Sequence, residues 1–405
     1  MSMMNDMLGR SVAVTFVKAP KEEWRITHVE SAPLGATMEL SKFPDNNQGA
    51  ALMKRTTKYV ALDVHQATTV VAVREQGGRI IARAILPTEN VAIAEFFRGM
   101  RGSVHVAFEE GTQAQWLHDL VVPLVDRVVV CDVRGEPRAN KADQLDAERL
   151  SRRLLAGDVR PVYHGSGDRM TLQELARTYL NLVEDCTRAM LRLKALFRAR
   201  GIAAAGKRIY GVADRERWLG RLLDPGARFR AEILYTEIDT LRGLRPKAKS
   251  RMVAEARRDP AWRRLNAIPF LGPVKVSLLL AIMKTPWRFR TKRSLWAYAG
   301  LAVVTHSSAD HEFVGGRVVR KRRKPLTRGL NRNHNRVLKN VFKSTASAAL
   351  GRSGPFKDLY GEMVTRGMRP DMARLTLARK FAALTLSLWK SEEAFDASKL
   401  KQHVV

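Results

Sequence analysis

Four carboxylates occur in a fixed order in the first third of the chain, each where it could serve as a metal ligand. Asp63 and Glu109 each end an apolar run that is typical of a buried strand. Asp143 and Asp146 are three residues apart at the start of a predicted helix, so they would share one helical face. Two carboxylates on neighbouring strand ends and two on one helical face could hold a pair of Mg²⁺ ions. That arrangement stabilises both the attacking and the leaving oxygen in phosphoryl transfer.

Three of these four carboxylates also have an ordinary structural interpretation. Asp63 could simply end its strand, and Asp143 and Asp146 could stabilise the first turn of a helix through its dipole. Spacing alone favours that interpretation of the helical pair. An inward carboxylate in an apolar strand is costly without a partner, and the four positions taken together favour metal ligands. Glu110 replaces Glu109 as the ligand if the strand register shifts by one residue.

The charge of the chain predicts a polyanionic partner. The formal net charge is +31 at pH 7, and binding to a phosphate backbone should weaken steeply as salt is added. The two cysteines, Cys131 and Cys186, have neither metal nor redox spacing, which fits a reducing compartment. No apolar stretch approaches membrane-spanning length, and the N-terminus lacks a secretory signal. We therefore expect a cytoplasmic, nucleoid-associated protein with no membrane partner.

The pattern of the chain predicts an α/β part followed by an α-helical part. Residues 1–55 show little periodicity and are expected to be a partly disordered N-terminal extension. Residues 58–165 read as three successive strands and then alternating helices and strands, the order of a ribonuclease-H-like domain. Residues 168–258 predict a long, coiled-coil-like helical connector that either mediates oligomerisation or packs only as a private helix pair. Residues 262–395 predict a second, mainly α-helical domain.

Two local patterns predict how elements begin in the second half. Thr171 and Glu174 have the spacing of a capping box at the start of the connector. Residues 265–276 look like half of a helix-hairpin-helix, in which a glycine turn at Gly272 leads into a helix whose backbone amides face a phosphate. A plain helix–turn–helix connection is the alternative. Lys275 lies in this motif and is a candidate phosphate contact.

A long stretch of the C-terminal domain is basic without interruption. From Phe313 to Lys357 there is no acidic residue, whereas a solvated charged face normally alternates in sign, so we expect a nucleic-acid-binding surface. Residues 331–335 (Asn-Arg-Asn-His-Asn) could contact nucleic acid, or one asparagine could cap the next helix. The cations expected to bind nucleic acid are Lys275, Arg317, Arg320, Lys321, Arg322, Arg323, Lys324, Arg328 and Arg332.

Several motifs resemble, in the same order, those of the insertion sequence 110 family of transposases, which are bridge-RNA-guided serine recombinases, and of the related Piv-type DNA invertases. The resemblance covers roughly residues 58 to 350. The motifs are Ala-Leu-Asp-Val-His (61–65), Phe-Glu-Glu-Gly (108–111), Lys-Ala-Asp-Gln-Leu-Asp-Ala (141–147), Ile-Pro-Phe-Leu-Gly-Pro (268–273), Tyr-Ala-Gly-Leu (298–301) and His-Ser-Ser-Ala-Asp (306–310).

The resemblance implies a RuvC-like N-terminal domain with an Asp-Glu-Asp-Asp site for Mg²⁺ and a C-terminal transposase domain with a nucleophilic serine. The serine position matches Ser308. The family often has Ser-Gly there, whereas this chain has Ser308-Ala309, and Ser307 is the alternative nucleophile. The four metal positions match Asp63, Glu109, Asp143 and Asp146.

The resemblance further implies a DNA transposase or recombinase of a mobile insertion element. Its partners would be element-end and target DNA, a structured guide (bridge) RNA, and further copies of the chain in a dimer or tetramer, with the serine and the metal site of one composite centre contributed by different protomers. One rival is a metal-dependent, structure-selective nuclease similar to Holliday-junction resolvases, which would need the carboxylates but not Ser308. The other is a non-catalytic nucleic-acid-binding descendant of a transposase.

Overall fold

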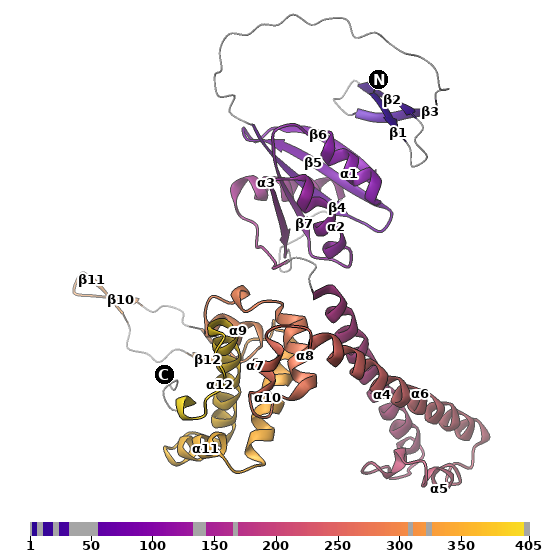
Figure 1. Cartoon of the computed structure of the whole chain (residues 1–405), viewed down its shortest axis with the longest axis vertical. Coiled ribbons are helices and arrows are strands. Elements are labelled where there is room, and N and C mark those ends of the chain that lie inside the picture. Colours follow the sequence, from indigo (N-terminus) through magenta and orange to yellow (C-terminus); the bar gives the residue numbers. More distant parts are fainter. Residues whose placement is uncertain are drawn as a thin grey trace, which may run out of the picture. The chain divides into compact units, whose positions relative to one another are not determined.

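The chain forms two compact units, Met1–Ser166 and Gly167–Val405 (Figure 1). The computed structural model describes residues 2–5, 11–18, 24–31, 56–132, 143–164, 169–306, 311–320 and 326–400. The first unit carries two β-sheets, and the second is mostly helical.

Three short strands lie in the N-terminal segment, where the sequence analysis expected little regular structure. They are β1 (Ser2–Asn5), β2 (Ser11–Lys18) and β3 (Trp24–Ser31). All pairing in this sheet is antiparallel, in the order β1-β2-β3. Val14 lies opposite Val29 in the register, and such β-branched residues are typical of strands.

A five-stranded mixed sheet forms the centre of the first unit, in the order β6-β5-β4-β7-β8. Strands β4, β5 and β6 form an antiparallel meander, while β7 and β8 run parallel to β4. This mixed sheet is consistent with the predicted ribonuclease-H-like fold. The strands are β4 (Thr57–Val64), β5 (Thr68–Glu75), β6 (Ile80–Pro87), β7 (Ser103–Glu109) and β8 (Arg127–Cys131).

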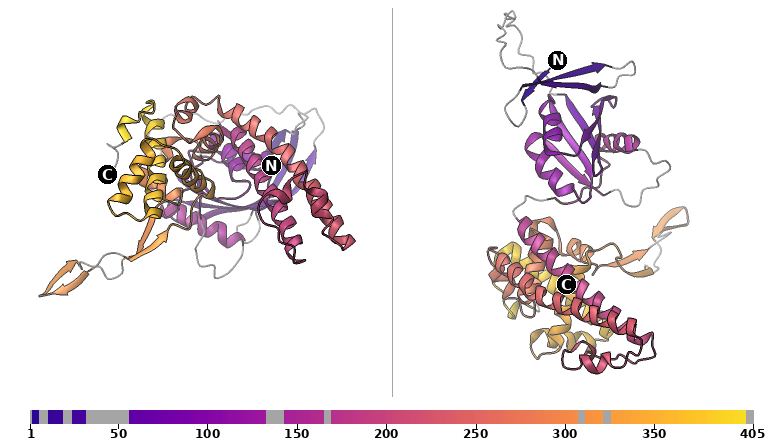
Figure 2. Two further views of the ribbon diagram at one scale, coloured as in Figure 1. Left: turned by 90° about the horizontal axis from the view of Figure 1, so that it is seen from below. Right: turned by 90° about the vertical axis from the view of Figure 1, so that its right-hand side faces the viewer.

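Helices cover both faces of this sheet (Figure 2). Helices α1 (Asn90–Arg98) and α2 (Ala114–Val121) bury Phe97 and Leu117 in the larger core against one face. Helix α3 (Asp143–Ala156) covers the other face. Each strand alternates its side chains between the two layers, so one face of every strand is directed at α3.

Helix α3 runs antiparallel to β4. Near its start, Ala147 packs against Val70, which lies opposite Asp63 in the β4–β5 register. Near its end, the side chain of Leu155 approaches Gly78 in the turn between β5 and β6, where an added Cβ would lie 3.8 Å from it. The first turn of α3 therefore lies at the carboxyl-end edge of β4, where Asp63 is placed.

A buried arginine fastens α3 to the sheet. Arg74 on β5 is only 6% exposed. Its Nε donates to the Ser151 hydroxyl at 3.3 Å and its Nη2 to the Glu148 carbonyl at 3.3 Å, both on α3, while Nη1 donates to the Gly78 carbonyl. Burial, followed by repulsion from Arg152, lowers the pKa of this guanidinium. The guanidinium therefore links the helix, the strand and the hairpin turn.

Two long helices of the second unit, α4 (Met170–Arg198) and α6 (Pro225–Ala256), pack side by side and antiparallel (Figure 1). At their far end, the short helix α5 (Arg215–Leu219) and the turn Arg208–Tyr210 help to close a small core of their own. In that core the Tyr235 hydroxyl donates to a backbone carbonyl at 2.9 Å. Burial raises the pKa of Tyr235 to about 12.

The near end of this helix pair shares one large core with the rest of the unit, to which Tyr179 of α4 and Met252 of α6 contribute. The other elements are α7 (Trp262–Asn266), α8 (Gly272–Met283), α9 (Lys292–Tyr298), α10 (Arg336–Leu350), α11 (Pro355–Thr365), α12 (Pro370–Ser391), β9 (Val303–His306), β10 (His311–Val314), β11 (Arg317–Arg320) and β12 (Leu326–Leu330).

The predicted capping box at Thr171 is wrong. Helix α4 begins at Met170, and the preceding Arg169 makes no side-chain cap. Arg169 instead donates through Nε to Asp259 at 2.6 Å. Glu174 accepts from Arg177 at 2.7 Å and does not reach back to the helix start. An ion pair to the segment that follows α6 therefore takes the place of local capping. Helix α6 itself is capped by Asp224.

A buried lysine lies in the core of the second unit. Lys380 on α12 is 7% exposed, and its Nζ has no hydrogen-bond partner among the described residues. Burial, with a smaller repulsion from Lys292, lowers the pKa of Lys380 to about 8. The folded state therefore disfavours the charged amine, which costs stability at neutral pH.

We expect Arg74→Met to lower the free energy of unfolding by about 2–4 kcal/mol, because it removes the buried guanidinium whose hydrogen bonds join α3 to β5 and to the turn at Gly78. Backbone amides of α3 should exchange with solvent hydrogen faster in the variant, while those of β4 stay protected. The control is Arg79→Met, whose side chain is 77% exposed in a surface pair with Glu75 and should change stability by less than about 0.5 kcal/mol. Unchanged protection of α3 in Arg74→Met would contradict the role of this residue.

We expect Lys380→Met to stabilise the protein by about 2 kcal/mol at pH 7, because it removes a buried charge. The pKa of Lys380 lies below its ordinary value in the folded state, so wild-type stability should rise with pH between about 8 and 10.5. The advantage of the variant should shrink over that range. Urea unfolding at pH 7 and at pH 10 measures this, with exposed Lys357→Met as the control. An advantage that does not change with pH would rule out the buried charge as its cause.

Candidate functional site

Asp63 and Glu109 lie side by side at one edge of the sheet. Strands β4 and β7 are parallel neighbours, and Leu62 pairs with Phe108 in their register. Asp63 and Glu109 are the next residues on each strand. The carboxyl ends of parallel strands meet at one edge, which is a frequent position for ligand-binding residues.

The side chains of both strand carboxylates belong to the layer under α3. Ala61 and Ala107 pack with Leu150 of α3 in one core cluster. Because strand side chains alternate between faces, residues two positions further along each strand share that face. Asp63 and Glu109 therefore point toward the helix that carries the other two predicted ligands.

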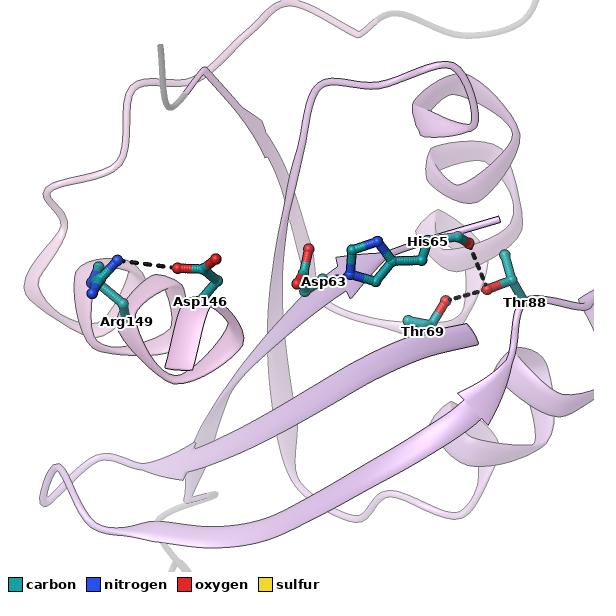
Figure 3. Close-up of polar contacts among 6 residues, drawn as sticks. All are labelled: Asp63, His65, Thr69, Thr88, Asp146 and Arg149. Carbon is teal, nitrogen blue, oxygen red and sulfur yellow. Dashed lines mark hydrogen bonds and ion pairs between the residues drawn. The ribbon is translucent and has the colours of Figure 1, made fainter. Parts of the chain in front are cut away.

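Asp146 lies in the first part of α3, on the side turned toward Asp63 (Figure 3). It is partly exposed, and it accepts a hydrogen bond from Arg149 at 3.1 Å. Asp143 begins the helix three residues earlier, but its side chain lies outside the described part of the structure. The start of α3 thus comes close to the sheet edge that carries the two strand carboxylates.

The turn after β4 is braced by hydrogen bonds (Figure 3). The Thr88 hydroxyl donates to the His65 carbonyl at 3.0 Å and lies 2.9 Å from the hydroxyl of Thr69. His65 places Nε2 at 3.2 Å from Asp63 Oδ2. This turn holds the imidazole beside the carboxylate, on the same edge of the sheet.

The donor chemistry of this edge fits Mg²⁺. Carboxylate oxygens are the hard ligands that this ion prefers, and Asp63, Glu109 and Asp146 supply them from three elements. Among the described side chains, no three His, Cys, Asp or Glu residues already lie close enough to hold a metal ion. The described carboxylates therefore provide the right atoms at one edge without forming a complete ligand group.

Glu110 belongs to a different cluster from Glu109. Its Oε2 lies 2.9 Å from Nε2 of His164, whose Nδ1 lies 3.3 Å from Gln115. The ring of His164 packs on that of His118 at 5.5 Å between centroids. Glu110 thus connects the end of β7 to the segment that follows α3. The sequence analysis missed this cluster because no motif links Glu110 to His164, 54 positions away.

The predicted nucleophile lies outside the described residues, as does its alternative Ser307. Ser308 falls between β9 and β10. The chain leaves the helical part through β9 and returns through β12, and these strands pair antiparallel with His306 opposite Leu326. The predicted cations Lys321, Arg322, Arg323 and Lys324, and the side chains of Arg320 and Arg328, also lie outside the described part of the structure.

Two motifs that are separate in the sequence meet at the base of this segment. The side-chain amide of Asn331 donates to the Ala297 carbonyl at 3.0 Å, and the backbone of Asn335 donates to the Tyr298 carbonyl at 2.8 Å. Gly300 has a positive φ of 64°, and a Cβ added there would lie 2.5 Å from Cγ of His334. Only glycine fits against that ring, so this contact fixes how the end of α9 meets the segment before α10.

Asn335 caps α10, since its side chain accepts from the backbone of Leu338 at 3.0 Å. This confirms the capping interpretation for one asparagine of residues 331–335. Arg332 of the same segment is exposed, so its side chain remains accessible for the predicted contact with nucleic acid.

The side chain of Lys275 points back toward the turn that precedes its helix, α8. Phe270 has a φ of 66° and Gly272 of 64°, which makes the sharp connection into α8. The amine of Lys275 donates to the Phe270 carbonyl at 3.1 Å, and burial lowers its pKa. In this structure the lysine therefore stabilises the turn, and a phosphate contact would require it to exchange that carbonyl for another acceptor.

Two family models match separate parts of the chain. Residues 60–199 match the DEDD transposase family of IS110 elements, and residues 262–360 match the family described as transposase IS116/IS110/IS902. The first match contains the four carboxylates, and the second contains Ser308 and the whole of the uninterrupted basic stretch. No curated protein matches the chain. None of the described helices is both long and apolar enough to cross a membrane.

The two matches occur in the expected order and together cover more than half of the chain. They support the assignment of this protein to the IS110 family of transposases, the DNA-processing proteins of mobile insertion elements.

Proposed function

We propose that this transposase cuts and rejoins DNA through Ser308, with Mg²⁺ held by Asp63, Glu109, Asp143 and Asp146. The observation that carries the proposal is the direction of α3. The helix begins at the edge of the sheet where β4 and β7 end, so Asp146 lies on the side of the helix turned toward Asp63, and Asp143 is the first residue of the same helix. Carboxylates from three separate elements at one edge are the donor set of a phosphoryl-transfer site.

In the proposed reaction the Ser308 hydroxyl attacks a DNA phosphate. Its Oγ forms a bond to phosphorus and loses its proton, while the bond from phosphorus to the 3′-oxygen breaks and that oxygen takes up a proton. The product is a phosphoserine link that a 3′-hydroxyl of another strand later attacks, which releases Ser308 and rejoins the DNA. Bound Mg²⁺ would supply charge stabilisation of the phosphate oxygens.

The residues of the chain that carry positive charge would hold the DNA. Arg317 and Arg332 are exposed and belong to the stretch without acidic residues, so they can neutralise phosphate charge as it develops. We propose that a structured RNA encoded with the element selects the target by base pairing. The protein then needs to recognise only backbone and shape, which fits a net charge of +31.

A metal-dependent nuclease is the second candidate. The carboxylate edge lies wholly within the first compact unit, whereas Ser308 belongs to the second. Without the serine, metal ions held by these carboxylates would activate water to cleave DNA, and no covalent link between protein and DNA would form.

A covalent-trapping assay separates these two functions. Full-length protein is incubated with labelled element-end DNA, the co-encoded RNA and Mg²⁺, and denaturing gels detect protein bound to DNA. We expect an adduct in wild type, and a loss of at least 100-fold in both Ser308→Ala and Asp63→Asn, since each removes a group that the step requires. Glu110→Gln is the control for a neighbouring carboxylate and should retain the adduct.

One result would reject the serine mechanism and leave the metal-dependent nuclease. In it, DNA is cleaved without any adduct, and this cleavage persists in Ser308→Ala but is lost in Asp63→Asn. Cleavage in Asp63→Asn at the wild-type rate would reject the metal site. Ser307→Ala, which should keep the adduct, tests the assignment between the two adjacent serines.

A further inference from the structure

The segment that follows the predicted nucleophile forms a small β-hairpin. Strands β10 and β11 pair antiparallel, with Phe313 opposite Val318 and Val314 opposite Arg317. Gly315 and Gly316 form the turn, with φ of 58° and 80°. Positive φ at both central residues is the geometry of a tight two-residue hairpin loop, so the hairpin has a defined register and a narrow tip.

Apolar side chains near the tip of this hairpin are open to solvent. Phe313 is 78% exposed and Val318 is 60% exposed. They form a cross-strand pair on one face, and Val314 and Val319, also exposed, lie on the other. The hairpin projects away from the helices of its unit (Figures 1 and 2). An aromatic residue exposed beside aliphatic ones on a projecting element indicates a binding contact.

The charge around the hairpin selects the kind of partner. Arg317 lies on β11 beside these side chains. The hairpin carries one acidic residue, Glu312, opposite Val319, and no acidic residue follows from Phe313 to Lys357. A second copy of this chain would bring another net charge of +31 to the same surface, which opposes docking there. A polyanion has the opposite sign. Nucleic acid also offers apolar base faces to the exposed ring, which an acidic protein surface does not.

A two-stranded β-ribbon is also narrow enough to enter a groove of nucleic acid. The major groove of B-DNA admits a β-ribbon, and proteins insert apolar side chains between base steps to open or bend a duplex. A ring that stacks on an unpaired base contributes about 1–3 kcal/mol for each base. Phe313 at the exposed end of a narrow hairpin can reach bases, while Arg317 across the other face can reach phosphate.

We propose that the β10–β11 hairpin inserts into nucleic acid, with Phe313 and Val318 against bases and Arg317 on a phosphate. This inference rests on the proposed function only in that the partner is nucleic acid. It adds a residue that recognises bases, whereas the cations of the basic stretch recognise the backbone. The hairpin lies close in sequence to Ser308, so insertion would hold the strand near the serine-bearing segment.

The test measures binding of the full-length protein to three labelled probes by fluorescence anisotropy: a DNA duplex, a single strand of the same sequence and an RNA hairpin. Phe313→Ala should weaken binding to at least one probe by about tenfold or more. Phe313→Tyr, which keeps the ring, should bind like wild type. Leu223→Ala removes an apolar side chain that is 94% exposed elsewhere in the unit, and it should have no effect.

Salt dependence separates the apolar contact from the ionic one. Between about 50 and 200 mM salt, Phe313→Ala should lower the affinity and leave the slope of log K against log salt unchanged, whereas Arg317→Ala should reduce that slope by about 1. A 2-aminopurine base in the probe reports stacking, and its fluorescence should change on binding of wild type but not of Phe313→Ala. The probe that responds identifies the source as duplex DNA, single-stranded DNA or RNA.

Equal affinity of wild type and Phe313→Ala for all three probes would overturn the inference. So would a Phe313→Ala variant that binds nucleic acid normally but loses self-association in sedimentation, because the hairpin would then be a protein contact. These results are independent of the trapping assay. Loss of binding in Phe313→Ala without any adduct in wild type would support the hairpin and reject the serine mechanism.

Discussion

The attachment of α3 to the sheet is the constraint on which the first unit depends. A buried guanidinium, Arg74, joins this helix to β5 and to the hairpin turn at Gly78. Its hydrogen bonds go to a hydroxyl and to backbone carbonyls, and a second link between helix and sheet runs from Arg83 of β6 to the Glu148 carboxylate at 2.7 Å. The aliphatic contacts of Leu150 and Leu154 then fix the helix along the strands. In this position of the helix, Asp146 lies on the side turned toward Asp63.

Close packing also constrains the chain on both sides of the segment that contains Ser308, between β9 and β12. Gly300 must lack a side chain because the ring of His334 occupies the space of its Cβ. Asn331 joins the end of α9 to the chain that returns from β12, and Asn335 begins α10 from the same place. The described ends of the segment are thereby held by hydrogen bonds and close packing, so a rigid base supports the serine-bearing part of the chain.

The elements of the first unit could be predicted because apolar runs and turn residues mark them locally. Asp63 and Glu109 follow from strand ends, and their pairing follows from parallel neighbours. The side-chain links could not be predicted, since His164 meets Glu110 and Arg74 meets Ser151 across 54 and 77 positions. The capping signal failed for a related reason. A distant ion pair, from Arg169 to Asp259, replaced the local hydrogen bonds that the sequence pattern favoured.

Positive charge and apolar contact contribute differently to the binding of nucleic acid. A net charge of +31 attracts any phosphate backbone and does not distinguish one sequence from another. Chemistry at one phosphate needs a strand that is held still, and ionic contacts alone let nucleic acid slide. A short-range contact such as the exposed Phe313 supplies what the charge lacks, because stacking acts only when ring and base are in register. The exposed ring is therefore best understood together with the basic stretch, as the contact that converts attraction into a fixed position.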